Sequence, residues 1–182
     1  STNDGELHWK DVSESSLEYV WELGGTNSGF CLGGYTGSGT NNIIDKFSFS
    51  SNTTATDHGD LSRNIRGLAG HSSSDYGFSS GGYTSSVIDK FAFSSNTTAS
   101  DHGDLTVSVG GLVGFSSSDS GFTAGGEDSG TKTNTINKFS FSSNVTASDH
   151  GALISSKYLA AGISSADYGF YAGGHPGGPG SG

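Results

Sequence analysis

The sequence predicts an all-β protein made of three repeated units, each a small antiparallel sheet. The chain of 182 residues repeats itself with a period of 44 to 48 residues, and such a period is typical of arrays with one supersecondary element per repeat. Gly, Ser, Thr and Asn dominate the repeat, and no long stripe of apolar residues has the helical period. Apolar residues make up only 31% of the chain, so a thin core shared between neighbouring units is expected.

Each unit carries four markers in the same order: a Gly-Gly pair, a Lys-Phe pair, a His-Gly pair and a Gly-Phe pair. The units are predicted at about 29–76, 77–120 and 121–168, followed by a spare terminal strand. We expect the aromatic residues of the Lys-Phe and Gly-Phe pairs to form the core between units. These residues are Phe47, Phe91, Phe139, Phe78, Phe122 and Phe170. The double glycines are Gly33-Gly34, Gly81-Gly82, Gly125-Gly126 and Gly173-Gly174.

The local patterns within a unit predict short strands. Residues 43–49 (IIDKFSF) are rich in Ile and Phe, as expected for a strand. Residues 73–77 (SSDYG) predict a turn before the next strand, because Asp bonds nearby backbone amides and Gly accepts a positive φ. About four strands in 44 to 48 residues is the size of one propeller blade.

The unit GGY…IDKFSF…HGDL…R…LAGHSSSDYGFSSGG resembles a kelch motif, and the resemblance covers about Gly29 to Gly174. It implies kelch-like antiparallel blades, arranged as a β-propeller or as a stacked repeat. The kelch tryptophan is absent, and its arginine is present only in unit one, as Arg63 or Arg66. Blade packing is therefore expected to differ from that of the family. The amino-acid sequence of the whole unit is also similar to repeats in tail-fibre and other virion proteins of marine bacteriophages.

Three units leave a closure problem, because propeller rings usually have about four to eight blades. Segment 1–24 is predicted to attach or cap one end, and residues 175–182 (HPGGPGSG) form a Gly/Pro-rich tail. Uncovered strand edges invite pairing with another chain. The sequence therefore predicts closure or capping by homo-oligomerisation. The fibre resemblance favours a trimer, and a six-blade ring of two chains is the alternative.

Charge and motif content argue against several function classes. The formal net charge of -10 argues against a nucleic-acid partner, and no apolar run is long enough for a membrane span. The repeated Asp-His pairs, such as Asp57-His58, are interpreted as turns, because a catalytic or metal site normally occurs once per chain. No catalytic residue, metal site or cofactor is predicted. A secreted propeller enzyme of the galactose-oxidase type is a second alternative, although Cys31 stands alone without the matching Tyr-His set that such a site needs.

The remaining hypothesis is recognition by the residues that vary between units, because loops on a rigid scaffold commonly carry binding. We predict a non-enzymatic virion or extracellular surface protein that binds a host-surface glycan or protein and contacts other virion proteins. A purely structural virion or filament component is the alternative. Asn52, Asn96 and Asn144 start sequons that indicate either glycosylation or a Ser/Asn/Thr turn. The candidate binding residues are Tyr35, Tyr83, Glu127, Asp128, Lys132, His71 and Arg66.

Overall fold

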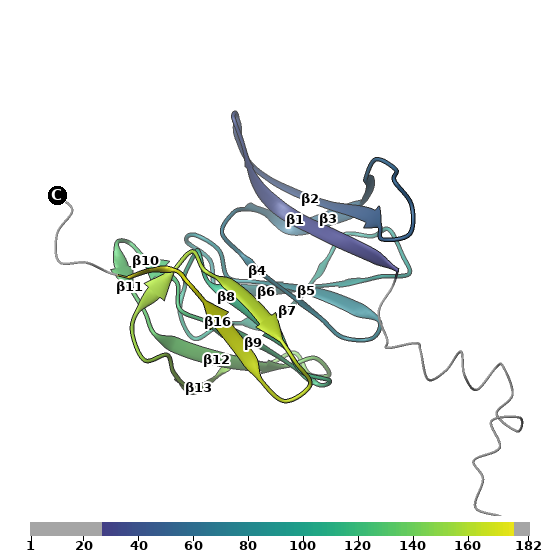
Figure 1. Cartoon of the computed structure of the whole chain (residues 1–182). Coiled ribbons are helices and arrows are strands. Elements are labelled where there is room, and N and C mark those ends of the chain that lie inside the picture. Colours follow the sequence, from purple (N-terminus) through teal and green to yellow (C-terminus); the bar gives the residue numbers. More distant parts are fainter. Residues whose placement is uncertain (1–26, 177–182) are drawn as a thin grey trace, which may run out of the picture.

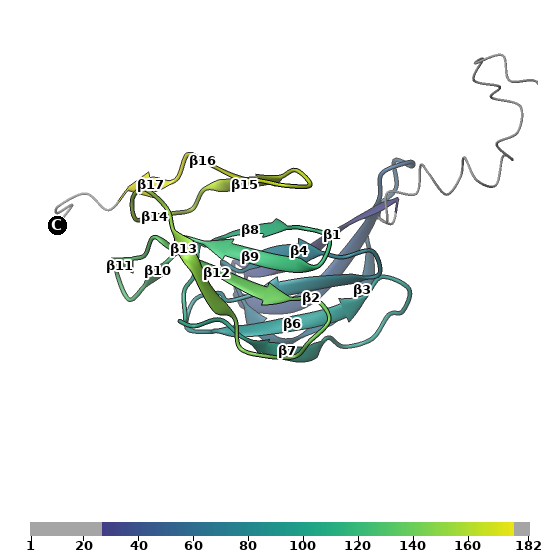
Figure 2. The same cartoon turned by 90° about the horizontal axis from the view of Figure 1, so that it is seen from below.

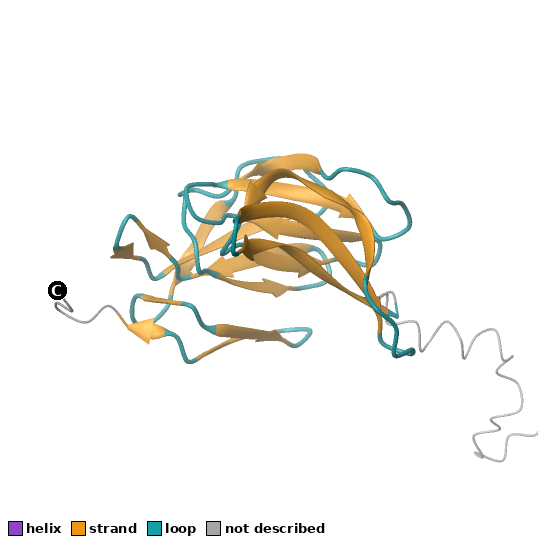
Figure 3. Ribbon diagram, turned by 90° about the horizontal axis from the view of Figure 1, so that it is seen from above, coloured by secondary structure: helices purple, strands orange, loops and turns teal. Residues whose placement is uncertain are grey.

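The computed structural model describes residues 27–176. The regular secondary structure in that range consists of β-strands, without helices (Figures 1 and 3). The predicted all-β class is confirmed. Segment 1–24 and residues 177–182 of the predicted tail lie outside the described residues. The strands are β1 (Ser28–Thr36), β2 (Gly39–Ser48), β3 (Thr56–Ile65), β4 (Ala69–Ser72), β5 (Tyr76–Ser80), β6 (Val87–Ala92), β7 (Ser100–Asp104), β8 (Val113–Ser116), β9 (Ser120–Ala124), β10 (Glu127–Asp128), β11 (Thr131–Lys132), β12 (Thr135–Ser140), β13 (Ser148–Ala152), β14 (Lys157–Tyr158), β15 (Ala161–Ser164), β16 (Gly169–Ala172) and β17 (His175–Pro176).

The strands form a series of antiparallel sheets that follow one another along the chain. The first sheet has the order β1-β2-β3, the second β4-β5-β6-β7 and the third β8-β9-β12-β13. The β15–β16 hairpin lies beside β8 (Figure 2), and short pairs join β10 with β11 and β14 with β17. Between residues 27 and 176 the sheets do not close into a ring. The last strand of each predicted unit joins the sheet of the next unit, so sequence repeat and sheet are offset by one strand.

The repeated glycines explain why the markers recur. In the Gly-Phe pairs that begin at Gly29, Gly77 and Gly121 the glycine lies beneath the phenyl ring of the neighbouring Lys-Phe strand, and a Cβ on Gly77 would collide with the ring of Phe91. In the double glycine that ends β5, Gly81 and Gly82 have φ values of 65° and 112°. L side chains rarely adopt such values. Glycine is therefore required both for ring packing and for the bend after the strand.

The core between successive sheets combines aromatic contacts with buried aliphatic side chains. Phe93 stacks on Phe30 with ring centroids 5.0 Å apart, and Phe141 stacks on Phe78 at 4.6 Å. Of the six phenylalanines expected in the core, Phe78, Phe91 and Phe139 are buried, and Phe122 is partly buried against the third sheet. The expectation was wrong for Phe47 and Phe170, whose side chains are 38% and 55% exposed. Each lies where no neighbouring sheet covers it within the described residues.

The Asp-His-Gly segments join the sheets through hydrogen bonds. The Asp57 carboxylate accepts the Gly59 amide at 2.8 Å, which fixes the predicted turn. His58 Nε2 lies 2.9 Å from the Ala92 carbonyl of the second sheet, and His102 Nε2 lies 2.8 Å from the Ser140 carbonyl of the third. Because a carbonyl only accepts, each ring nitrogen donates. These repeated pairs thus have a role in sheet packing.

Asp89, which precedes the lysine of the Lys90-Phe91 pair, is buried although it carries a charge. The Asp89 side chain is fully buried, and its Oδ2 accepts from Arg63 Nη1 at 2.8 Å. Arg63 Nη2 also donates to the Val87 carbonyl at 2.9 Å. In the third sheet the matched residue is Asn137, which is neutral and accepts from Thr106. Arg63 therefore connects the first sheet to the second.

Candidate recognition surface

Three of the predicted binding residues converge at the end of the sheets where the double glycines lie. The Arg66 guanidinium lies 5.0 Å from the ring centroid of Tyr35 and 5.3 Å from that of Tyr83. Both distances are within the range of a cation–π interaction. We call these residues the tyrosine–arginine stack. Tyr35 comes from the β1–β2 hairpin, whereas Tyr83 follows β5, so the stack bridges two sheets.

Glycines and a backbone hydrogen bond hold Tyr83 in place. A Cβ on Gly67 or Gly110 would lie 2.7 Å or 2.6 Å from the Tyr83 ring, so both positions leave room for it. The Tyr83 amide donates to the Arg66 carbonyl at 3.1 Å. Gly110 occupies the position in unit two that Arg66 has in unit one. Tyr35, by contrast, is 62% exposed. One ring is therefore fixed, and the other is presented to solvent.

The same edge continues with a second group of varied residues. Lys132 Nζ lies 3.8 Å from Glu127 Oε2 and 5.1 Å from the Tyr158 ring centroid. The ring centroids of Tyr158 and His175 are 5.5 Å apart. Asp128 pairs with Thr131 in the exposed tip of the β10–β11 hairpin. The Gly110 amide donates to the Glu127 carbonyl at 3.0 Å, which connects this group to the stack.

Tyr158 and His175 were not among the predicted site residues. The repeat contained the signal for both. Tyr158 stands at the unit position of Arg66, and His175 directly follows a double glycine, as Tyr35 and Tyr83 do. Aligning the units position by position would have found them.

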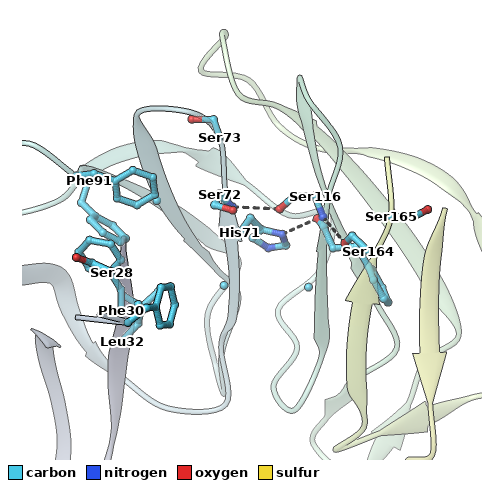
Figure 4. Close-up of a pocket in the computed structure, with 17 residues that line it drawn as sticks. Ser28, Phe30, Leu32, His71, Ser72, Ser73, Phe91, Ser116, Ser164 and Ser165 are labelled. Carbon is cyan, nitrogen blue, oxygen red and sulfur yellow. Dashed lines mark hydrogen bonds between the residues drawn. The ribbon is translucent and has the colours of Figure 1, made fainter. Parts of the chain in front are cut away.

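His71 lies apart from this surface, buried between the second and third sheets. Its Nδ1 lies 3.0 Å from the Phe115 carbonyl and its Nε2 lies 2.7 Å from Ser80 Oγ. Burial lowers the pKa of His71 to about 4, although the hydrogen bond to Phe115 opposes the shift. The residue lines a cavity of about 620 Å³ together with Phe30, Ser116 and Ser164 (Figure 4).

The buried imidazole predicts a loss of stability in acid. The folded protein keeps His71 neutral down to about pH 4, whereas the unfolded chain takes up the proton near pH 6.5. The stability that depends on neutral His71 is complete above pH 6.5 and falls as the pH drops to 4. The expected loss is about 3 kcal/mol in the free energy of unfolding. Urea denaturation across this pH range measures it.

The control for this prediction is His71→Phe, because Phe115 occupies the matched position in unit two. The variant is expected to lose stability at pH 7, since Ser80 and the Phe115 carbonyl lose a partner. Its stability should then fall less between pH 6.5 and 4 than that of the wild type. Equal acid dependence in both proteins would contradict the assignment.

No group of three or more His, Cys, Asp or Glu side chains within residues 27–176 is placed to hold a metal ion. That range also contains no helix long and apolar enough to cross a membrane. Neither protein-family models nor curated proteins give a match to this chain.

Proposed function

We propose that the protein is a non-enzymatic module of an extracellular or virion surface and that its tyrosine–arginine stack recognises a host-surface glycan. The observation that carries the proposal is the convergence of three residues that vary between units onto one exposed edge. The repeated part of the unit builds the sheets, and the varied segments that follow the double glycines lie with Arg66 at the ends of the sheets. The similarity of the units to kelch-type and phage tail-fibre repeats supports placement at a virion surface.

The chemistry of the stack suits a sugar better than a nucleic acid or a lipid surface. The aromatic ring of Tyr35 offers an exposed apolar face with a polar tip. Arg66, also exposed, carries five planar N–H donors that match hydroxyl and carboxylate oxygens. Because the chain has a formal net charge of -10, a highly charged polyanion would be repelled elsewhere on the molecule. A neutral sugar, or one with a single carboxylate, fits both conditions.

The test is binding of the purified protein to a glycan array and to candidate host cells. Tyr35→Ala and Arg66→Ala are each expected to weaken binding by about tenfold, the effect of losing one good contact of about 1.4 kcal/mol. Tyr76→Ala is the matched control. Tyr76 is 39% exposed and begins β5, at the opposite end from the double glycine.

Loss of binding in all three variants, or in none, would contradict a role for the stack. If the wild-type protein binds neither glycans nor cells, the structural-component alternative gains support.

A further inference from the structure

The outer face of the third sheet is one half of an interface that occurs twice inside the chain. Phe122 contacts His150 at 5.1 Å between ring centroids, as Phe78 contacts His102 at 5.0 Å. Within residues 27–176, however, no ring stacks on Phe122 as Phe141 stacks on Phe78. A largely apolar cavity of about 230 Å³ lies instead between Phe122, Ile136 and Leu153 of this face and the β15–β16 hairpin, which contributes Tyr168 and Tyr171 to its lining.

Polar groups of this face also lack the contacts that their equivalents make. The His102 ring bonds the next sheet, and the amide of Ala147 donates to the Asp104 carbonyl at 2.7 Å. A Cβ on Gly103 would meet the backbone of Val145, whereas one on Gly151 meets nothing within 4 Å. All residues of β13 are exposed, unlike the two buried residues of β7. The third sheet therefore presents an acceptor face.

The first sheet presents the complementary half. Phe47 and Phe49 stand at the unit positions of Phe91 and Phe93, which pack against the preceding sheet. In the first sheet these rings are 38% and 70% exposed. Residues 50–56, which include Asn52, are exposed too, whereas the matched Asn96 donates to the Asp57 carbonyl at 3.3 Å. The first sheet is therefore a donor face that has no acceptor within the described residues.

We propose that the donor face of one copy docks on the acceptor face of a second copy, head to tail. The second copy is the occupant because both halves of the same interface stand open at opposite ends of one chain. Phe49 would take the place on Phe122 that Phe93 takes on Phe30, and His150 would donate to the Ser48 carbonyl, as His58 does to Ala92.

Strand content supports the same arrangement. The first sheet lacks the strand that β4 and β8 supply to theirs, and β1 has no described neighbour on that edge. In the last part of the described range, β15 is the equivalent strand of its unit, and within residues 27–176 it pairs with β16 alone. β1 and β16 occupy equivalent positions in the repeated unit. In the proposed dimer, β1 of one copy therefore displaces β16 of the other copy and pairs with its β15. The shared sheet then has four strands.

The expected register follows from the repeat. Ile163 pairs with Phe170 and Ala161 with Ala172 in the hairpin. Residues 140 positions earlier carry the same markers, so Ile163 should face Phe30 and Ala161 should face Leu32 of the second copy. Each copy then contributes three complete sheets. Two copies give a closed six-blade ring, within the usual range of about four to eight, which favours the dimer over the trimer.

Sedimentation velocity of the full chain over a range of concentrations tests the proposal. The wild type is expected to form a dimer. Combined substitution of Phe47→Ser and Phe49→Ser should raise the dissociation constant by about tenfold or more, because two aromatic anchors are lost. Tyr76→Ser is the control, since Tyr76 is 39% exposed and lies off both faces. Its association should equal that of the wild type.

Disulfide trapping tests the register without relying on affinity. Two variants in a Cys31→Ser background are mixed, one with Leu32→Cys and the other with Ala161→Cys. A cross-linked dimer is expected in the mixture and in neither variant alone. The proposal is overturned by a wild type that stays monomeric at every concentration, or by association that the paired serine substitutions leave unchanged. Absence of the mixed cross-link overturns the strand pairing.

Discussion

Replacing Phe91 by alanine is expected to lower the free energy of unfolding by about 3–5 kcal/mol. The Phe91 side chain is 4% exposed and packs between the first and second sheets, edge-on to Phe30 at 5.4 Å between ring centroids. Its ring also lies over Gly77 of the neighbouring strand. Because glycine offers no side chain to fill the gap, the site cannot collapse around the smaller residue. Chemical denaturation of the purified variant measures the loss.

Phe47→Ala provides a matched control from within the chain. Phe47 occupies the same unit position and lies over Gly29, as Phe91 lies over Gly77, but it is 38% exposed. Its replacement should cost less than half as much, at protein concentrations too low for self-association. Similar losses in the two variants would show that stability does not depend on burial between the sheets.

The sequence was sufficient to predict the class of fold, because the repeat displays its own constraints. Gly29 precedes Phe47 as Gly77 precedes Phe91, and the two spacings differ only by the length of the loop after the double glycine. The pattern recurs because in each sheet the phenyl ring lies on the glycine. The offset between repeat and sheet was not predictable in this way. A repeat has no natural starting point, and only hydrogen-bond pairing shows that β4 belongs to the second sheet.

The candidate site was predicted in part. Variation between units singled out Tyr35, Arg66 and Tyr83, and the structure places them in one stack. The same criterion also singled out His71, which is buried. A varied position within a strand can face either solvent or a neighbouring sheet, and the sequence of a single chain does not separate the two. The charged pair Arg63 and Asp89 illustrates the same limit, because their contact joins residues from different sheets.

Replacing Arg63 by valine is expected to cost about 3 kcal/mol, because it leaves the Asp89 carboxylate buried without a counter-charge. The 2.8 Å contact between Arg63 Nη1 and Asp89 Oδ2 is the ion pair that joins the first and second sheets. The value is at the lower end of the range for broken buried pairs, since the Arg63 side chain is 21% exposed. Valine is chosen because Val107 stands at the matched position in unit two.

The decisive comparison adds Asp89→Asn to the Arg63→Val variant. The next interface along the chain already combines Val107 of unit two with the neutral Asn137 of unit three, whose side-chain oxygen accepts from the Thr106 amide. In the double variant the new asparagine side chain carries no charge, and the Ser62 amide, which donates to Asp89 at 3.3 Å in the wild type, can donate to the amide oxygen instead. The second substitution should therefore restore at least half of the stability lost in the first, as measured by urea denaturation at pH 7. If the double variant is instead less stable than Arg63→Val alone, the cost arises from lost packing of the arginine stem, and the buried charge does not determine it.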